Sequence, residues 1–325
     1  EMALEMLHLE DSKLTKELDK LLAWLEGNKP ELLCLSNALQ AGMIRELKKR
    51  LGVPVLCFFQ GEDSFVDGLP EPFRGACWQA MRERLPEADL LVAPSRFYAD
   101  LMKQRLDSRD LFIEVLPNGI DLEGYGPPVD KSGPPVIGYL ARMMKEKGLA
   151  LLVEAFVHLR NELAHPDCRL RIAGTATKEN DPLVRTLQDH LRSEGLADAV
   201  SWHPNISREE KVDLLAGMSL FSVPVTYPEA FGLYVVEAMA SGVAVVQPDA
   251  AAFPEIVGAT GGGVLVNPGD AAALAAEWHR LLERPDEMRK LGESGRRGAR
   301  EHYSVDTMRE RFTEIARRVA SGIRK

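Results

Sequence analysis

The sequence has little cysteine, and the cysteines it has form no motif. Four cysteines occur in 325 residues. None is spaced as a CxxC pair, which argues against a zinc ribbon, a redox pair and a disulfide framework. The four are Cys34, Cys57, Cys77 and Cys168. Three of them lie in or beside apolar stretches, so reduced, buried thiols are predicted.

Long hydrophobic runs and an excess of positive charge are also missing. No apolar run reaches the ~18–20 residues of a membrane-spanning helix. The net charge is −9, so a basic footprint for nucleic acid over the whole chain is absent. No signal peptide is visible, which predicts a cytoplasmic location. A length of 325 residues with 45% hydrophobic content predicts two domains, each with a substantial core.

The first part of the chain alternates short apolar strands with helices. Candidate strands are 32–36, 53–59, 90–93 and 112–116, and a helix is expected at 38–51. Strands that are apolar on both faces and separated by helices predict a parallel α/β sheet. The segment 125–135 is rich in proline and glycine and is the best linker candidate. A first domain is therefore predicted at 1–124.

The second part repeats this pattern more completely. We predict strands at 136–140, 170–173, 200–202, 220–223, 243–246 and 264–266, and helices near 147–164, 182–195, 207–218, 232–241 and 270–283. Six strands with helical crossovers predict a complete Rossmann-like domain at 125–304. Two more helices follow, and the last, at 305–325, is expected to pack back toward the first domain. Their arginine pairs predict a solvated face, with peripheral contact to an anionic membrane as the alternative.

The stretch Pro228–Gly242, PEAFGLYVVEAMASG, carries the most chemical information. A helix should start at Phe231–Gly232, at the carboxyl end of a parallel strand, where such sheets bind ligands. Its first free amides could bind a phosphate. Glu229 precedes the helix and Glu237 lies inside it, and carboxylates bind hydroxyl-rich groups such as ribose or a sugar. The simpler alternative is that Glu229 satisfies the helix dipole and Glu237 lies on the surface.

Two cations follow the first strand of the same domain. Arg142 and Lys147 stand at the strand end and at the start of the next helix. Two positive charges at one strand terminus suit a diphosphate, whose negative charge grows as it leaves. Solvated loop charge is the alternative for either side chain alone.

These motifs, in this order, resemble family 4 of the retaining glycosyltransferases. The resemblance rests on Arg-x4-Lys-Gly after the first strand of the second domain and on E-x7-E in PEAFGLYVVEAMASG. Pro117–Asp121 and Pro254–Val257 extend it. It implies the α/β GT-B fold, with two Rossmann-like parallel-sheet domains facing a cleft. It also implies a retaining hexosyltransferase that moves a sugar from a nucleoside-diphosphate-sugar to an acceptor hydroxyl.

The resemblance also implies roles for individual residues. Of the catalytic residues, Arg142 and Lys147 would hold the donor diphosphate. Glu229 would contact the transferred sugar. The donor-binding set would grip the ribose, the distal phosphate and the base, and it comprises Glu237, Gly232, Leu233, Phe231, Gly174 and His203. In the first domain, Gln60 and Gly61 are counted with the donor-binding residues. They occupy the loop where many members carry His-Gly-x-Asp, so Gln60 replaces that histidine.

The resemblance leaves other functions open. The family's first strands and glycine-rich loop have no counterpart, so the first domain is expected to be incomplete and the chain truncated. A nucleotide-binding GT-B module without transfer activity and a nucleotide-sugar epimerase therefore remain alternatives. No cofactor and no metal are expected, because no DxD-type pair stands in a suitable loop. The acceptor, whether saccharide, lipid-linked or small molecule, stays open, as does an oligomer of identical chains.

Overall fold

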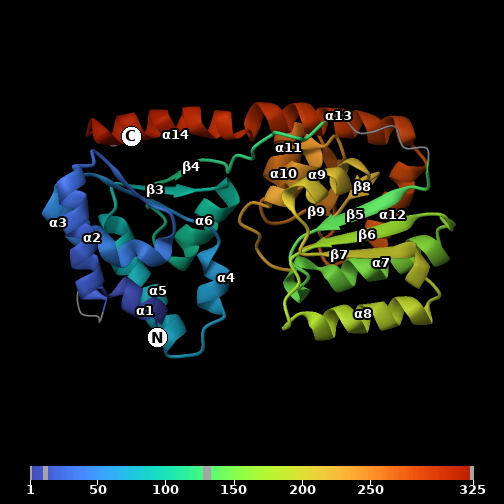
Figure 1. Ribbon diagram of the computed structural model, residues 1–325, viewed down its shortest axis with the longest axis horizontal. Helices are drawn as coiled ribbons and strands as arrows, with labels where there is room; N and C mark the ends of the chain where they lie inside the picture. The colour runs from blue at the N-terminus through green and yellow to red at the C-terminus, as the bar shows by residue number, and fades with distance from the viewer. Residues whose placement is uncertain (1, 10–13, 127–132, 323–325) are drawn as a thin grey trace. The chain divides into compact units, whose positions relative to one another are not determined.

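The computed structural model describes residues 2–9, 14–126 and 133–322, and the chain forms two compact units. The first unit runs to Asn118 and includes the C-terminal segment from Met308, and the second unit spans Gly119–Thr307. Most of the predicted linker, residues 127–132, lies outside the described residues. Each unit is built on one parallel sheet (Figure 1).

The first unit contains a sheet of four parallel strands that follow one another in chain order. All four strands were predicted, and the prediction is confirmed. All four residues of the third strand are buried. Cys34 in the first strand is exposed, so the prediction of a buried thiol is wrong there, because this strand lies at the edge of the sheet. The four strands are β1 (Leu33–Leu35), β2 (Val55–Phe58), β3 (Leu90–Ala93) and β4 (Ile113–Val115).

Helices surround this sheet, and some of them differ from the sequence prediction. The α-helices before β4 are α1 (Met2–Leu7), α2 (Thr15–Asn28), α3 (Ile44–Leu51), α4 (Glu62–Asp67), α5 (Phe73–Arg84) and α6 (Arg96–Arg105). The helix predicted at 38–51 begins as a 3-10 helix, η2 (Ala38–Met43), and becomes α-helical only at Ile44. A Cβ on Gly42 would lie 2.2 Å from the Met6 carbonyl oxygen, so η2 packs backbone to backbone against α1.

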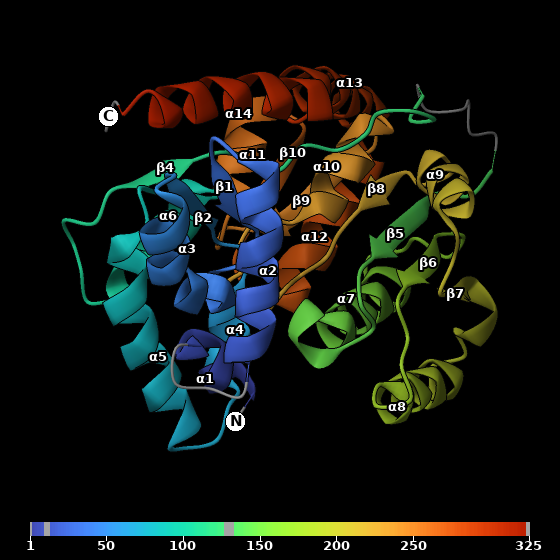
Figure 2. The ribbon, with the colours of Figure 1, turned by 60° about the vertical axis from the view of Figure 1, so that its left-hand side comes forward.

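The last helix, α14 (Val305–Ala320), packs on the first sheet. Ile315 and Val319 join Leu56, Leu90 and Val92 in one apolar cluster. Arg318 of this helix forms an ion pair with Glu114 on β4. The C-terminal segment therefore completes the core of the first unit, as Figure 2 shows from a second side.

The second unit has a sheet of six parallel strands in the order β10-β9-β8-β5-β6-β7. The chain moves outward from β5 to β7, then crosses to β8 and moves outward in the other direction. This is the doubly wound order, with its switch point between β5 and β8. The strands are β5 (Val136–Leu140), β6 (Arg169–Gly174), β7 (Val200–Pro204), β8 (Leu220–Phe221), β9 (Ala244–Pro248) and β10 (Gly263–Val266).

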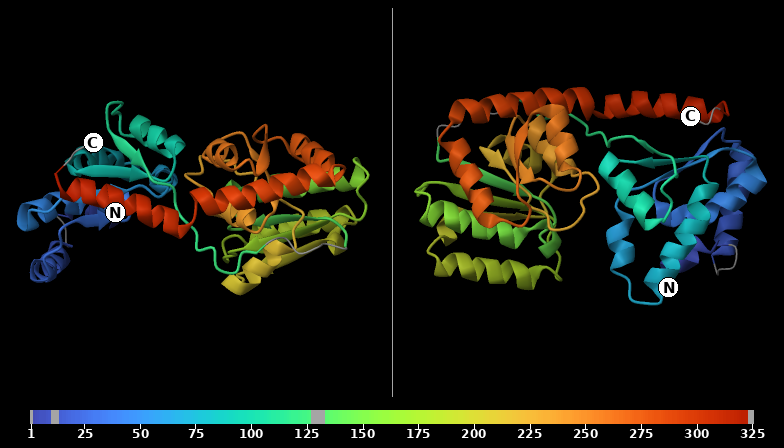
Figure 3. Two further views of the ribbon diagram at one scale, coloured as in Figure 1. Left: turned by 90° about the horizontal axis from the view of Figure 1, so that it is seen from above. Right: turned by 180° about the vertical axis from the view of Figure 1, so that it is seen from behind.

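Helices cover both faces of this sheet (Figure 3). On one face α7 (Leu149–Asn161) packs against α8 (Asp181–Ser193) and α12 (Ala271–Leu282). On the other face α13 (Pro285–His302) packs against α10 (Leu233–Ala240) and α11 (Phe253–Thr260), and α9 (Arg208–Ala216) connects β7 to β8. The sequence prediction missed α11, which connects β9 to β10. The helix predicted near 270–283 is α12, which follows β10. In the described part of the chain, no helix is long and apolar enough to cross a membrane.

Candidate functional site

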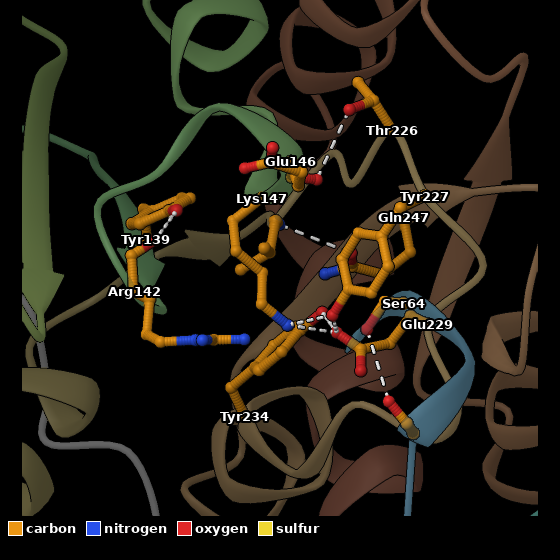
Figure 4. Close-up of polar contacts among 12 residues, drawn as sticks. Ser64, Tyr139, Arg142, Glu146, Lys147, Thr226, Tyr227, Glu229, Tyr234 and Gln247 are labelled. Atoms are coloured by element: carbon orange, nitrogen blue, oxygen red, sulfur yellow. Dashed lines mark hydrogen bonds and ion pairs between the residues drawn. The ribbon is translucent and has the colours of Figure 1, made fainter. Parts of the chain in front are cut away.

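The switch point of the second sheet brings the predicted catalytic side chains together. Arg142 and Lys147 follow the carboxyl end of β5, and Glu229 lies between β8 and the start of α10. Because β5 and β8 are neighbouring parallel strands, both loops leave the sheet at the same edge. Figure 4 shows the three side chains directed toward a common point.

The centre of this site is an ion pair between Lys147 and Glu229. Lys147 Nζ contacts Glu229 Oε2 and donates a hydrogen bond of 2.5 Å to the Tyr227 hydroxyl. The hydroxyl groups of Tyr227 and Tyr234 donate to the same Oε2, at 2.7 and 2.8 Å. The ammonium also lies 4.9 and 5.0 Å from the two tyrosine ring centres. Oε2 is thus held by three donors, whereas Oε1 has no hydrogen-bond partner among the described residues.

The ion pair is largely removed from water. The side chains of Lys147 and Glu229 are only 8% and 12% exposed. Burial lowers the pKa of Lys147, with a contribution from the positive charge of Arg142, and Glu229 opposes this effect. Burial and the negative charge of Glu229 raise the pKa of Tyr234 well above its ordinary value. The Tyr234 hydroxyl therefore keeps its proton and donates a hydrogen bond to the carboxylate.

The backbone around Lys147 is fixed by close packing. Lys147 ends the short 3-10 helix η4 (Lys145–Lys147), and Gly148 follows with φ +71°. A Cβ on Gly148 would lie 1.7 Å from the Pro224 carbonyl oxygen, so only glycine fits between the two loops. The amide of Thr226 donates to the Glu146 carbonyl at 2.9 Å. These contacts join the loop that carries Lys147 to the loop that leads to Glu229.

Arg142 differs from Lys147 in having no side-chain partner among the residues that the structure describes. It is exposed, and no described residue forms an ion pair with its guanidinium group. Its backbone is held, because the Tyr139 hydroxyl donates to its carbonyl oxygen at 2.9 Å. The guanidinium remains available to an anionic ligand, and Figure 4 shows it extending toward the Lys147 side of the site.

The start of α10 supplies the other positive end of the site. Gly232 precedes the helix with φ +93°, and no side chain of the described residues caps it. A Cβ on Gly232 would lie 2.8 Å from the Phe253 ring. Leu233 is 42% exposed, whereas Phe231 is buried with its ring 5.6 Å from that of Tyr303. No side chain of the described residues caps the amides of Gly232 and Leu233; Leu233 is exposed, Gly232 is buried, and Phe231 anchors the turn in the core.

Glu237 lies further along α10 in a polar cluster of its own. Lys211 Nζ on α9 donates to Glu237 Oε1 at 2.5 Å, and Tyr125 lies close enough to the same carboxylate for its charge to act on the phenol. Burial raises the pKa of Tyr125, and the charge of Glu237 adds to this effect. The Glu237 side chain is 17% exposed. It is therefore oriented by its partners and still partly open to a ligand.

The resemblance assigns Glu237 to the ribose, so we predict that Glu237→Ala raises the Kd for UDP, GDP and ADP by a similar factor of about tenfold or more, through the loss of one charge-assisted contact. Lys211→Met should have a smaller effect, since the carboxylate itself is retained. Isothermal titration calorimetry with the three nucleotides measures both effects. Unequal losses among the three would place Glu237 near the base and not the ribose.

Gly174 and His203 lie on the neighbouring strands β6 and β7, toward the carboxyl ends of those strands. Gly174 ends β6 with φ +134°, and a Cβ there would lie 1.9 Å from the Ala141 carbonyl oxygen. This close packing against Ala141 requires glycine at position 174. His203 Nε2 lies 3.1 Å from the Ser201 hydroxyl. Burial lowers the pKa of His203, with a contribution from the Arg171 charge.

Gln60 and Gly61 belong to the first unit. The prediction of a loop at 60–63 is only partly right, because α4 begins at Glu62. Gly61 has φ +102°, and its amide and that of Gln60 donate to the buried Glu62 carboxylate. The Gln60 side chain accepts a hydrogen bond of 3.3 Å from Asn118. Gln60 is exposed at the carboxyl end of β2.

Sequence reasoning missed three residues that contact the predicted acids. Tyr227, Tyr234 and Lys211 all hold a carboxylate of the site. The position of Tyr227, two residues before Glu229, was a usable signal, since a hydroxyl so close in sequence can reach the carboxylate. Lys211 comes from a different helix, so no local pattern pointed to it.

Comparison with protein families gives two matches that together span most of the chain. Residues 127–298, more than half of the chain, match the model "Glycosyl transferases group 1". Residues 9–123 match the model "Glycosyltransferase Family 4". The boundary between the matches falls near the boundary between the two structural units.

Curated relatives include sugar transferases of several kinds. An MMP alpha-(1->4)-mannosyltransferase of Mycolicibacterium hassiacum is 33% identical over 222 residues, which are 68% of this chain and 51% of the relative. A D-inositol 3-phosphate glycosyltransferase of Nocardiopsis dassonvillei is 30% identical, over 78% of this chain and 62% of the relative. A GDP-mannose-dependent monoacylated alpha-(1-6)-phosphatidylinositol monomannoside mannosyltransferase of Corynebacterium glutamicum is 27% identical, with 73% and 64% covered. The chain thus spans between half and two thirds of these relatives.

Solved structures show the same two-domain GT-B architecture. Sucrose-phosphate synthase from Thermosynechococcus elongatus superposes with a TM-score of 0.78 at 20% identity, over 95% of this chain and 80% of that one. Anabaena Alr3699/HepE, solved in complex with UDP, gives a TM-score of 0.80 at 19% identity, with 92% and 81% covered. At these identities the likeness shows the fold, and the predicted fold class is confirmed.

Proposed function

Because the chain belongs to the group 1 glycosyl transferases, we propose that it transfers a sugar from a nucleoside-diphosphate-sugar donor to an acceptor hydroxyl with retention of the anomeric configuration. The observation that carries this proposal is the buried Lys147–Glu229 pair beside the uncapped start of α10. In this pair, the Lys147 ammonium would stabilise the negative charge of a leaving phosphate. The Glu229 carboxylate would stabilise the positive charge on the sugar carbon.

The positive groups of the site match the charge of a departing diphosphate. Arg142 and Lys147 approach it from the β5 loop, and the amides of Gly232 and Leu233 approach from α10. As the bond from the sugar to the phosphate breaks, negative charge grows on the phosphate oxygen, and fixed positive groups in a site with little water stabilise it. This set supports transfer without a metal ion, which we propose as part of the mechanism.

Glu229 is suited to stabilise the sugar in the transition state. Three donors hold Oε2 and leave Oε1 for the substrate. In this arrangement Oε1 would face the positive charge that develops on the anomeric carbon. For retention, we propose that the acceptor attacks from the same face and that the leaving phosphate oxygen takes its proton. Glu237, which lies within α10, would hold the ribose hydroxyls.

The proposal is tested by incubating the chain with UDP-, GDP- and ADP-sugars and a panel of saccharide and lipid-linked acceptors. GDP-mannose belongs in the panel because one relative is named for its dependence on it. Proton NMR of the product gives the anomeric configuration, which should equal that of the donor, and activity should survive EDTA. An inverted product would exclude the retaining mechanism. A changed nucleotide-sugar without acceptor would favour an epimerase, and tight nucleotide binding without turnover would favour a binding module.

The lowered pKa of Lys147 gives a pH prediction. The protonated lysine attracts the diphosphate, so the affinity for UDP or GDP should fall as the pH rises through the lysine pKa. Since burial lowers that pKa, the fall should begin at a lower pH than for an exposed lysine. Lys147→Arg should move the fall to higher pH. Titration calorimetry from neutral to alkaline pH measures this, with the uncharged nucleoside as the control, and an equal loss for nucleoside would contradict it.

A further inference from the structure

A cluster of two histidines and one glutamate lies away from the donor site, at the opposite edge of the second sheet. His165 stands in the turn before β6, at the amino end of that strand. His279 lies in the last turn of α12, and Glu283 follows the end of that helix. The donor site occupies the carboxyl edge, so the mechanism above uses none of these three residues.

The three side chains converge on one point. His165 Nε2 lies 2.8 Å from His279 Nδ1 and 3.7 Å from Glu283 Oε1. The ligand atoms of all three lie within 4.8 Å of one another. A tetrahedral zinc ion with bonds of about 2.0–2.1 Å separates its ligand atoms by roughly 3.3 Å. The two measured distances lie on either side of that value, so small side-chain movements would complete the geometry.

Hydrogen bonds fix the backbone from which these side chains extend. His165 begins a turn in which the Cys168 amide donates to the His165 carbonyl at 3.1 Å. Arg160, at the end of α7, donates to the Cys168 carbonyl at 2.6 Å. His279 and Glu283 are four residues apart, and the Glu283 amide closes the last turn of the helix on the His279 carbonyl at 3.0 Å. Residues at this spacing face the same side of a helix.

We propose that His165, His279 and Glu283 form a binding site for a divalent transition-metal ion, with zinc as the preferred ion and water as the fourth ligand. Two imidazole nitrogens and one carboxylate are the ligand types that zinc takes. The ion would join the turn before β6 to the end of α12, on the face where α7 packs against α12. Its role is structural, because it lies at the edge of the sheet remote from the donor site.

The cluster is open to the solvent on one side. The His165 side chain is 12% exposed and that of Glu283 is 63% exposed, which leaves a path for the ion from the solvent.

The test is a titration of the untagged chain with Zn²⁺, with thermal unfolding in parallel. We expect one equivalent to bind and the melting temperature to rise with the Zn²⁺ concentration. His279→Gln and Glu283→Gln should weaken binding on the order of a hundredfold. His158→Gln is the matched control, because His158 also pairs with a glutamate, Glu162, at 2.8 Å but lies outside the cluster. This variant should bind Zn²⁺ like the parent chain.

Cobalt substitution adds a spectroscopic readout. Co²⁺ bound by nitrogen and oxygen should give the visible bands of a tetrahedral site without the charge-transfer band of a thiolate. Such a band would point to Cys168 and overturn the proposal. Absence of stoichiometric Zn²⁺ binding, or equal binding by the parent chain and Glu283→Gln, would also overturn it. Glu283 is largely exposed, so its variant remains informative even if a histidine variant fails to fold.

Discussion

Replacing Glu229 by glutamine should reduce sugar transfer by about 10²–10³-fold or more, while the Kd for nucleoside diphosphate stays the same or becomes lower. The carboxylate is expected to stabilise positive charge that exists only in the transition state, so its loss should appear in kcat and not in nucleotide binding. Removal of its negative charge also frees Lys147, now paired with it, for the diphosphate.

The experiment compares kcat and nucleotide Kd for the parent chain, Glu229→Gln and Glu146→Gln. Glu146 lies beside Lys147 with an exposed side chain, so its variant controls for the removal of one negative charge near the site. Glu146→Gln should keep parental turnover and affinity. If Glu229→Gln lost nucleotide affinity by a larger factor than it lost turnover, this result would contradict the role assigned to Glu229.

Lys147→Met should weaken binding of UDP or GDP far more than binding of uridine or guanosine. The loss of one charge-assisted contact costs about 1.5–3 kcal/mol, or roughly 10- to 150-fold in Kd. Lys145→Met is the matched control, because Lys145 belongs to the same turn of 3-10 helix but is exposed. Equal losses for nucleotide and nucleoside would show that Lys147 does not contact the diphosphate.

The same substitution should also lower the free energy of unfolding. It leaves the Glu229 carboxylate buried without its cation, and breaking a buried pair in this way costs about 3–5 kcal/mol. The hydroxyl groups of Tyr227 and Tyr234 remain as donors, so we expect a value near the lower end. The double variant Lys147→Met, Glu229→Gln should recover much of the stability and none of the diphosphate affinity. Chemical denaturation with calorimetry separates the two effects.

Much of the fold follows from local patterns in the sequence. Short strands that are apolar on both faces, such as Leu90–Ala93, are typical of a parallel sheet covered on both sides, and all ten strands of the described residues were predicted. The helix at Phe253–Thr260 was missed because Pro254 and Gly258 interrupt its apolar pattern, although proline is acceptable in the first turn. The split of 38–51 at Ile44 was not predictable, since it depends on α1 packing against Gly42.

The sequence by itself determined which residue types stand at the carboxyl ends of β5 and β8. The residues next to Arg142, Lys147 and Glu229 in the sequence are enough to predict the strand, the turn and the start of the helix there. The tertiary structure decided what these residues contact. The crossover at the switch point makes β5 and β8 neighbours although about eighty residues separate them, and this places Lys147 on Glu229. The same long-range packing brings Lys211 to Glu237 and His165 to His279. Contacts of this kind depend on how the elements pack in three dimensions, and no local spacing encodes them.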